Sequence, residues 1–329
     1  MQVIHDALSA PDLPNGTILT IGNYDGVHRG QQAVLSHVVE RAKAEGLASA
    51  VVTFDPHPLS VLRPESKPPL LTTPAQKEAL LDQTGVDFVL VVQFTPEFAQ
   101  TPARGFVRDF LAERLGAREI YVGSDFSFGH RREGDVTLLE QMGKTFGFEP
   151  IAVDEVRGQG ERISSTRVRS CLGEGDVVLA RRLLGRAYSL TGIIVRGDRM
   201  GQRLGWPTIN LAPDNELIPT DGVYATRTVF PSFPTVFDSV TNIGTRPTVY
   251  ENYERVVETH VLDFRNDVYG ERVEIGFYKR LREEQMFQSM MDLSAQIAKD
   301  VETAREFFRS LNELEGSEEE PVGFFTDGS

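Results

Sequence analysis

The sequence is short of cysteine and of positive charge, and both shortages narrow its chemistry. Its only cysteine, Cys171, excludes an intramolecular disulfide and a zinc site built from several cysteines. Lysine and arginine total 34 against 48 aspartates and glutamates, which gives a net charge of −14. A general nucleic-acid binder needs a basic surface, so we expect no nucleic acid among the partners. Phosphorylated ligands would have to be held by local arginines, backbone N–H groups or Mg²⁺.

Long apolar runs are also missing. No stretch reaches the roughly 20 apolar residues that a membrane helix needs. The first residues hold no basic segment followed by an apolar one, so no secretory signal is expected. These features predict a cytoplasmic protein with no membrane partner, and they leave the oligomeric state open.

The first half of the sequence alternates short β-branched runs with longer amphipathic ones. Strands are predicted at residues 17–21, 49–54, 86–94, 119–122 and 150–153, and helices at residues 31–45, 73–85, 101–116 and 136–146. Because strands that alternate with helices pair in parallel through right-handed crossovers, this half predicts an α/β fold with a doubly wound, Rossmann-like parallel sheet.

The pattern changes after about residue 185. Strands are predicted at residues 188–196, 222–230, 239–243, 255–264 and 272–278, with no helix-length pattern between them, which indicates an antiparallel barrel or sandwich. A closing helix is expected after Ser289 and Asp292, which suit a cap. Its apolar residues recur at spacings that fit one stripe: Phe287, Met290, Ile297, Val301, Phe308 and Leu311. We expect the methionines of this region to fill the core.

Three segments follow from these patterns. Residues 1–184 should form the α/β domain and residues 185–312 the β-barrel domain with its terminal helix. Residues 313–329 have little to bury and are rich in acidic side chains, so we expect a disordered tail.

The strongest local feature of the first half is the segment TIGNYDGVHRGQ at residues 20–31. A strand runs into a turn with Gly22, Gly26 and Gly30 and then into a helix. Such a turn brings backbone N–H groups and the positive helix end close to an anion, and His28 can donate to phosphate oxygens. An ordinary strand–helix connection would have the same spacing, so both interpretations stay open.

A second feature is the segment RISSTRVR at residues 162–169, at the start of a predicted helix. Hydroxyls at this place are usually helix caps. However, residues 157–186 hold seven arginines and three acidic residues, a basic island within an acidic chain. Such an island beside helix N–H groups is what a polyphosphate needs.

Four segments in one order carry a resemblance. GNYDGVHRGQ, TFDPHP, VGSDFSFGHRREGD and ISSTRVR resemble the motifs of the bacterial bifunctional riboflavin kinase/FMN adenylyltransferases, and the resemblance spans residues 1–311. It implies that the first domain is a nucleotidyltransferase, which joins the AMP part of ATP to FMN and releases pyrophosphate and FAD.

The resemblance also implies roles for individual residues. His28 is expected at the α-phosphate, with a phosphate-binding set around it: Gly22, Gly26, Gly30, Gln31, Ser164, Ser165, Thr166 and Arg169. The flavin side is expected at Asp125, Phe126, Phe128 and Arg162, although packing at a strand end would equally explain the two phenylalanines.

The chain departs from the family pattern at one position. The first motif usually reads His-x-Gly-His, and here Gln31 replaces the second histidine. An amide can donate a hydrogen bond but cannot carry positive charge. The loss of one transition-state donor typically costs about 3 kcal/mol, so adenylyl transfer should survive in a weaker form.

The second half has a glycine-rich segment at residues 197–205, with Gly197, Gly201 and Gly205. It lacks the Gly-Lys-Ser/Thr of a P-loop, and alone it would indicate a flexible hairpin loop. Thr208 and Asn210 follow on a predicted strand, where a spacing of two places them on the same face. Together with phosphate oxygens and water, these two ligands suit Mg²⁺.

The resemblance continues through GQRLGWPTIN, TDGVYA, TNIGTRPT, VETHVLDF, DVYG and LREEQMF, which are similar to the riboflavin kinase module. That module is a small β-barrel that transfers the γ-phosphoryl group of ATP to riboflavin and makes FMN. The implied roles are Mg²⁺–ATP binding for Thr208 and Asn210, a loop over the phosphates for residues 197–205, and a catalytic base for Glu258. Without the resemblance, Glu258 would be a surface residue of a strand.

Three hypotheses are compatible with the sequence. The first is a bifunctional enzyme whose substrates and products are riboflavin, FMN, FAD and ATP, with Mg²⁺ as cofactor. The second is a monofunctional riboflavin kinase with an impaired adenylyltransferase domain, marked by Gln31. The third is a flavin- or nucleotide-binding regulator without turnover, which would need neither the base nor the metal ligands.

Overall fold

The computed structural model describes residues 1–9, 13, 16–154, 156–158, 161–197, 200–247 and 253–315. They form two compact units, which divide between Ser164 and Ser165, earlier in the chain than the predicted domain boundary. Of the segment expected to be disordered, residues 313–315 end the last helix, and residues 316–329 lie outside the described residues. None of the helices in the described part of the chain combines the length and the apolar character needed to cross a bilayer.

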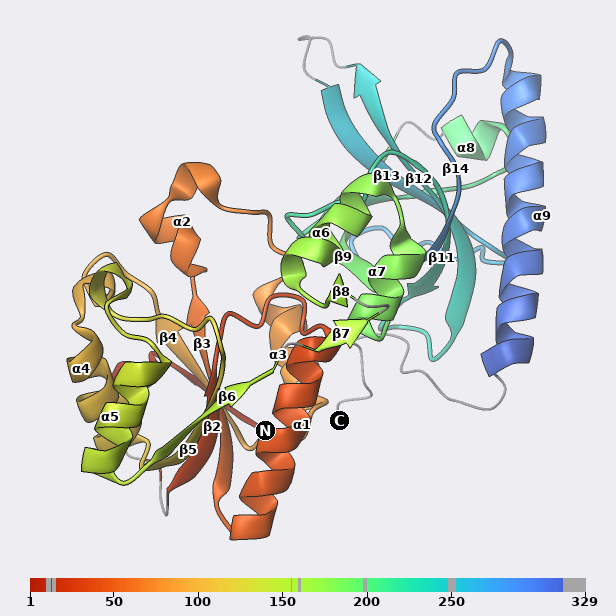
Figure 1. Ribbon diagram of the computed structural model, residues 1–329. Coiled ribbons are helices and arrows are strands. Elements are labelled where there is room, and N and C mark those ends of the chain that lie inside the picture. Colours follow the sequence, from red (N-terminus) through yellow and green to blue (C-terminus); the bar gives the residue numbers. More distant parts are fainter. Residues whose placement is uncertain are drawn as a thin grey trace. The chain divides into compact units, whose positions relative to one another are not determined.

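A six-stranded parallel sheet forms the centre of the first unit (Figure 1). Its strands are β1 (Gln2–His5), β2 (Thr17–Ile21), β3 (Ala48–Asp55), β4 (Phe88–Gln93), β5 (Ala117–Gly123) and β6 (Glu149–Val153). They lie in the order β1-β4-β3-β2-β5-β6, and every neighbouring pair is parallel. The predicted doubly wound sheet is thus confirmed. The sequence prediction missed β1, a four-residue edge strand that is exposed at both ends.

Helices cover both faces of this sheet. The helices of this unit are α1 (Arg29–Glu45), α2 (Pro58–Leu62), α3 (Pro74–Asp82), α4 (Ala103–Gly105), the π-helix η4 (Phe106–Arg114) and α5 (Val136–Phe146). The unit also has short 3₁₀ turns: η1 (Ala7–Ser9), η2 (Pro64–Ser66), η3 (Phe98–Gln100) and η5 (His130–Arg132). A small hairpin of β7 (Arg157–Gly158) and β8 (Glu161–Arg162) ends the unit. On one face α1 packs Val38 and Ala42 against Ile18 and Tyr121. The second face packs against η4 and α5.

The strand order creates a switch point between β2 and β5. From β2 the chain builds outward through β3 and β4, and it then returns to the other side of β2 to add β5 and β6. The loops that leave the carboxyl ends of β2 and β5 therefore turn away from each other. In open α/β sheets the crevice at this point is where ligands bind.

The second unit is a closed antiparallel barrel with three long helices (Figure 1). After α6 (Ser165–Glu174) and α7 (Val177–Leu184) come the strands β9 (Tyr188–Val195), β10 (Ile209–Pro213), β11 (Gly222–Val229), β12 (Val236–Pro247), β13 (Tyr253–Val261) and β14 (Arg272–Arg282), with the short α8 (Met200–Arg203) before β10 and α9 (Met290–Glu315) at the end. The barrel order is β10-β13-β12-β11-β14-β9, which confirms the predicted barrel.

The last helix packs on the outside of the barrel. Its residues Val301, Ala304 and Phe308 are buried against the outer face of β11, β12 and β14, where Val223 and Tyr278 meet them. Ser289 caps the helix by accepting a hydrogen bond from the Asp292 N–H, as predicted.

The prediction that the methionines near this helix fill the core is wrong. Met290 is 49% exposed, Met291 83% and Met286 100%. The residues of α9 that pack against the barrel core begin at Ile297. The first turn and the residues before it therefore lie beyond the buried part of the apolar stripe.

A ladder of hydroxyl groups crosses the interior of the barrel. Distances of 2.8 Å join neighbouring hydroxyls in the order Thr228, Ser239, Thr226, Thr241 and Thr259, and all five residues are fully buried. Side chains alternate between the two faces of a strand, so the next residues along, Asn242 and Glu258, face the outside of the barrel. The ladder thereby determines which face carries the polar side chains described below.

We expect Thr241→Val to destabilise the second unit by about 1–3 kcal/mol, because it leaves the hydroxyls of Thr226 and Thr259 short of a partner in a buried site. Chemical denaturation of the full chain measures this loss. The control is Thr245→Val on the exposed part of the same strand, which should change the unfolding free energy little. Equal effects of the two substitutions would contradict a stabilising ladder.

Candidate active sites

The turn after β2 has an unusual backbone that its own side chains hold in place. Tyr24, Gly26 and Val27 have φ angles of 49°, 89° and 40°. The buried Tyr24 hydroxyl lies 2.7 Å from the Thr20 hydroxyl, and burial raises the pKa of Tyr24 well above its ordinary value, so the phenol stays protonated. The turn is therefore a rigid element rather than a flexible connection.

Asp25 connects this turn to the segment before α3. Its carboxylate is buried and accepts hydrogen bonds from the Leu71 N–H at 2.9 Å, from the Thr72 N–H at 3.2 Å and from the Thr72 hydroxyl at 3.4 Å. The Gly26 N–H donates to the same hydroxyl, also at 3.4 Å. Charge-assisted bonds of this kind are stronger than neutral ones, so Asp25 connects the turn firmly to the segment before α3.

His28 and Gln31 form a reciprocal cap at the start of α1. His28 Nδ1 accepts from the Gln31 N–H at 3.3 Å, and Gln31 Oε1 accepts from the His28 N–H at 3.1 Å. His28 is 8% exposed, and its ring lies over Gly30, where a Cβ would be 3.2 Å from Nδ1. Gln31, which departs from the family pattern, thus has a structural role as well as an amide N–H group for a ligand.

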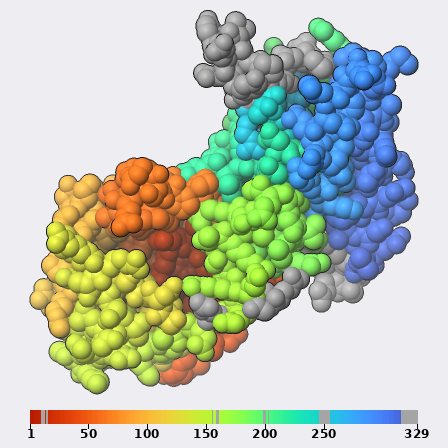
Figure 2. Space-filling model, turned by 45° about the horizontal axis from the view of Figure 1, so that its top comes forward, coloured from red at the N-terminus to blue at the C-terminus, as the bar shows by residue number. Residues whose placement is uncertain are grey.

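A cavity of about 220 Å³ opens beside this cap, at the switch point of the sheet. Figure 2 shows one face of the molecule, on which red surface from the start of the chain lies beside orange and yellow surface from later in the same unit. Seven of the residues predicted for the adenylyltransferase site line the cavity: Gly22, His28, Gly30, Gln31, Asp125, Arg162 and Ser164. Arg162 and Asp125 form an ion pair at its rim, with Nη2 and Oδ2 3.2 Å apart.

The remaining predicted residues of this site lie elsewhere. Gly26 is in the turn but does not line the cavity. The rings of Phe126 and Phe128 stack on each other at 5.3 Å and pack against the core of the unit. Ser165, Thr166 and Arg169 belong to α6, in the second unit.

Sequence analysis missed several parts of this site. Residues 122–124 and 153–154, at the carboxyl ends of β5 and β6, also line the cavity. These residues reach the cavity because β5 lies beside β2 in the sheet and β6 beside β5, and this strand order cannot be read from a single sequence. Tyr24, inside the first motif, lines the cavity as well, whereas Asp25 of the same motif holds the turn and does not line the cavity.

The second site lies on the outside of the barrel, where three polar side chains form a row across three strands. Asn210 of β10 pairs directly with Glu258 of β13, which pairs in turn with Asn242 of β12. Residues paired directly across antiparallel strands point to the same face, with Cβ atoms about 5 Å apart. The structure therefore places Asn210 and Glu258, both predicted for the kinase site, side by side, and it adds Asn242, which was not predicted although TNIGTRPT contains it.

The glycine-rich loop lies directly against this row. A Cβ on Gly197 would be 2.5 Å from Asn210 Nδ2, and one on Gly201 would be 3.1 Å from Thr208 Oγ1. At Gly197 only glycine leaves room for the Asn210 side chain, whereas a Cβ on Gly201 would clash first with the Trp206 carbonyl oxygen. The third glycine, Gly205, has a φ of 84° and an open surface around it.

The oxygen ligands of this site could hold a hard cation only together with ligands from outside the protein. The described residues contain no group of three or more His, Cys, Asp or Glu side chains that could hold a metal alone. The Thr208 hydroxyl and the Asn210 carbonyl are neutral oxygen ligands. Mg²⁺ binds proteins through few ligands and keeps its waters and phosphate oxygens, so this donor set fits Mg²⁺ delivered with a nucleotide.

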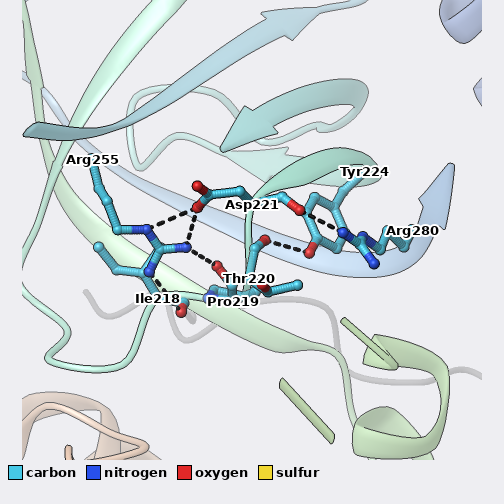
Figure 3. A network of polar contacts seen from close by, with 7 residues as sticks. All are labelled: Ile218, Pro219, Thr220, Asp221, Tyr224, Arg255 and Arg280. Atoms are coloured by element: carbon cyan, nitrogen blue, oxygen red, sulfur yellow. Dashed lines mark hydrogen bonds and ion pairs between the residues drawn. The ribbon is translucent and has the colours of Figure 1, made fainter. Parts of the chain in front are cut away.

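One end of the barrel is held by a network around Asp221 (Figure 3). Arg255 of β13 donates to the Asp221 carboxylate at 2.7 and 3.0 Å and to the carbonyls of Ile218 and Pro219. Arg280 of β14 donates to the Asp221 carbonyl at 2.6 Å. The segment before β11 is therefore fastened to two strands, next to the row of polar side chains.

Comparison with known proteins assigns each half of the chain. Residues 10–167 match the family model described as FAD synthetase, and residues 184–308 match the model described as riboflavin kinase. The chain is 40% identical over 305 residues to the bifunctional riboflavin kinase/FMN adenylyltransferase of Escherichia coli (strain K12), a match that covers 93% of this chain and 96% of that protein. It is 36% identical to the Haemophilus influenzae protein of the same name, over 94% of this chain and all of that one.

A solved structure supports the same architecture. The crystal structure titled macrolide-efflux protein from Streptococcus pneumoniae is similar with a TM-score of 0.83 and 27% identity, over 92% of this chain and 98% of that one. The two enzyme names of these relatives correspond to the two family models, one for each half of the chain. The chain belongs to the family of bifunctional riboflavin kinase/FMN adenylyltransferases, which make FMN from riboflavin and FAD from FMN.

Proposed function

We propose that the two reactions use two separate sites: the cavity at the sheet switch point for adenylyl transfer and the row Asn210–Glu258–Asn242 for phosphoryl transfer. The observation that carries this assignment is the row itself. A carboxylate flanked by two amides, beside a glycine-rich loop that approaches Thr208 and Asn210, has the parts that phosphoryl transfer requires.

At the first site, an oxygen of the FMN phosphate attacks the α-phosphorus of ATP while the bond to pyrophosphate breaks. FMN already carries its nucleophile, so the protein has to align two anions and neutralise the charge that develops. His28 and the N-terminus of α1 supply donors on one side of the cavity, and Ser164 lies on its lining. We assign Ser165, Thr166 and Arg169 to the same phosphates.

The flavin side of this site is proposed at the rim. Asp125 and Arg162 pair there and expose polar atoms to the cavity. The stacked rings of Phe126 and Phe128 support the end of β5 behind this pair, and the flavin would contact their edge. Arg162 is half exposed, so it can leave Asp125 to reach a phosphate.

At the second site, Glu258 accepts the proton of the ribityl 5′-hydroxyl as this oxygen attacks the γ-phosphorus of ATP, and ADP leaves. Thr208 and Asn210 would hold Mg²⁺, which supplies charge neutralisation on the phosphates when bound. Gly197, Gly201 and Gly205 let the loop backbone approach those phosphates. Asn210 and Asn242 flank the base and orient it.

The boundary between the two catalytic parts is also part of this proposal, because the two family models leave a segment between them unassigned. Residues 168–183 lie outside both models and contain most of α6 and α7. We keep residues 1–184 as the adenylyltransferase part and residues 185–312 as the kinase part. Cytoplasmic localisation also stays a prediction.

Exchange of one residue in each site should separate the two reactions. Glu258→Gln is isosteric and removes the proton acceptor, so FMN formation from riboflavin should fall by a factor of about 10²–10⁴. FAD formation from supplied FMN should stay at the wild-type rate. Chromatography of the flavins after incubation with ATP and Mg²⁺ measures both steps.

His28→Ala should have the opposite effect: FMN accumulates from riboflavin and FAD formation falls. Circular dichroism and the retained activity of the other site show that each variant is folded. If either substitution abolished both steps in a folded protein, the proposal of two independent sites would be wrong.

Gln31→His tests the departure from the family motif. A histidine here can place a positive charge at the cavity, so we expect the rate of FAD formation to rise, by up to about a hundredfold. The new side chain also gives up the bond from the His28 N–H, so thermal unfolding is measured alongside. The control is Gln83→His on the exposed surface of the same unit. An unchanged or lower rate would count against this interpretation of Gln31.

A further inference from the structure

Glu284, just after β14, places its carboxylate against β12, which is separated from β14 in the barrel by β11. A Cβ built on Gly244 of β12 would lie 2.0 Å from Glu284 Oε1 and 2.7 Å from its Cδ. Gly244 is itself buried, although Glu284 is exposed over much of its surface. The carboxylate therefore occupies the space that any side chain at position 244 would need.

This contact is made where β12 loses one partner strand. β11 begins at Gly222, opposite Ile243, so Gly244 and Thr245 extend past it. The Thr245 N–H lies close enough to the Glu284 carboxylate to lower its pKa. The carboxylate thus lies against β12 where this strand extends past β11.

The contact lies beside the row of the proposed kinase site. Gly244 pairs with Val256 across β12 and β13, one step along from the pair Asn242–Glu258 on the same outer face. Two residues along a strand span about 6.5 Å. Glu284 is thus close enough to influence the row through the backbone of β12 without being part of it.

Charged neighbours surround the carboxylate. Partial burial and the nearby Asp221 raise the pKa of Glu284 above its ordinary value, whereas the Thr245 N–H and Arg282 oppose this shift. Asp221 is fastened by Arg255, which pairs with Thr245 across the sheet (Figure 3). Arg282 in turn binds Asp300 of α9 at 2.9 Å. Asp221 repels the Glu284 carboxylate. Charge attraction alone therefore does not explain why this carboxylate lies against Gly244.

We propose that Glu284 is a positioning residue of the kinase site, which holds the end of β12 and the segment at residues 283–289 so that Asn242 faces Glu258. This inference rests on the proposed role of Glu258 as base. Glu284 acts on the row through the backbone of β12. Gly244 is part of the same contact, because only glycine leaves room for the Glu284 carboxylate.

The test is a double-mutant cycle in the full chain. Glu284→Ala removes the carboxylate, and Gly244→Ala displaces it with a single methyl group, at a position whose backbone suits alanine. Each should lower kcat for FMN formation on the order of tenfold, with the KM values for riboflavin and ATP changed less than kcat. The double variant should be no slower than either single variant, because both remove the same contact.

Two further variants complete the design. Glu284→Gln keeps an oxygen for the Thr245 N–H and should retain most of the activity. Glu283→Ala changes the exposed neighbouring residue and should behave as wild type. FAD formation from supplied FMN, measured on the same preparations, reports whether each variant is folded.

The outcomes separate the two proposals. Additive losses in the double variant, or a lowered melting temperature with unchanged kcat, would overturn the positioning role. If Glu258→Gln is inactive while Glu284→Ala and Gly244→Ala keep the wild-type kcat, the kinase site stands and the inference about Glu284 fails. If Glu258→Gln keeps its activity, the site itself is wrong and the inference fails with it.

Discussion

The proposed assignment of the two sites has to meet one electrostatic constraint: a chain with a net charge of −14 has to hold triphosphates. It cannot use a broad basic surface, so donors are concentrated where the fold supplies them at little cost in charge. The first unit uses the start of α1 at the sheet switch point, with His28 and Arg162 beside it. In the second unit, the proposed site has neutral oxygen ligands and a glycine-rich backbone, which would leave room for a cation that arrives with the nucleotide.

The barrel satisfies a second constraint by alternation along its strands. Thr241 and Thr259 enter the hydroxyl ladder inside, and the adjacent Asn242 and Glu258 consequently face outward. A shift of either strand by one residue would bury the carboxylate and expose the ladder. The buried hydroxyls therefore contribute to function by specifying register, besides contributing to stability.

The sequence predicted both folds, because periodicity and local motifs are properties of neighbouring residues. From the family resemblance it also predicted one kinase site for Thr208, Asn210 and Glu258. It could not give Asn242 or Glu284, whose roles come from strand register and from a side chain that crosses to another strand. The exposed Met290 has a similar cause: the stripe on α9 is longer than the barrel surface that covers it.

Glycines beside functional side chains connect these observations. At several glycines the space of a missing Cβ is taken or closely approached by a side chain in or beside a proposed site, among them Gly30 with His28, Gly197 with Asn210, and Gly244 with Glu284. None of these three glycines has a left-handed backbone, so conformational freedom does not explain them. Their shared property is the room they leave, which lets a polar side chain lie flat on the backbone and thereby restricts its orientation. A methyl group at Gly244 should therefore act like a substitution of Glu284, although it removes no atom of the carboxylate.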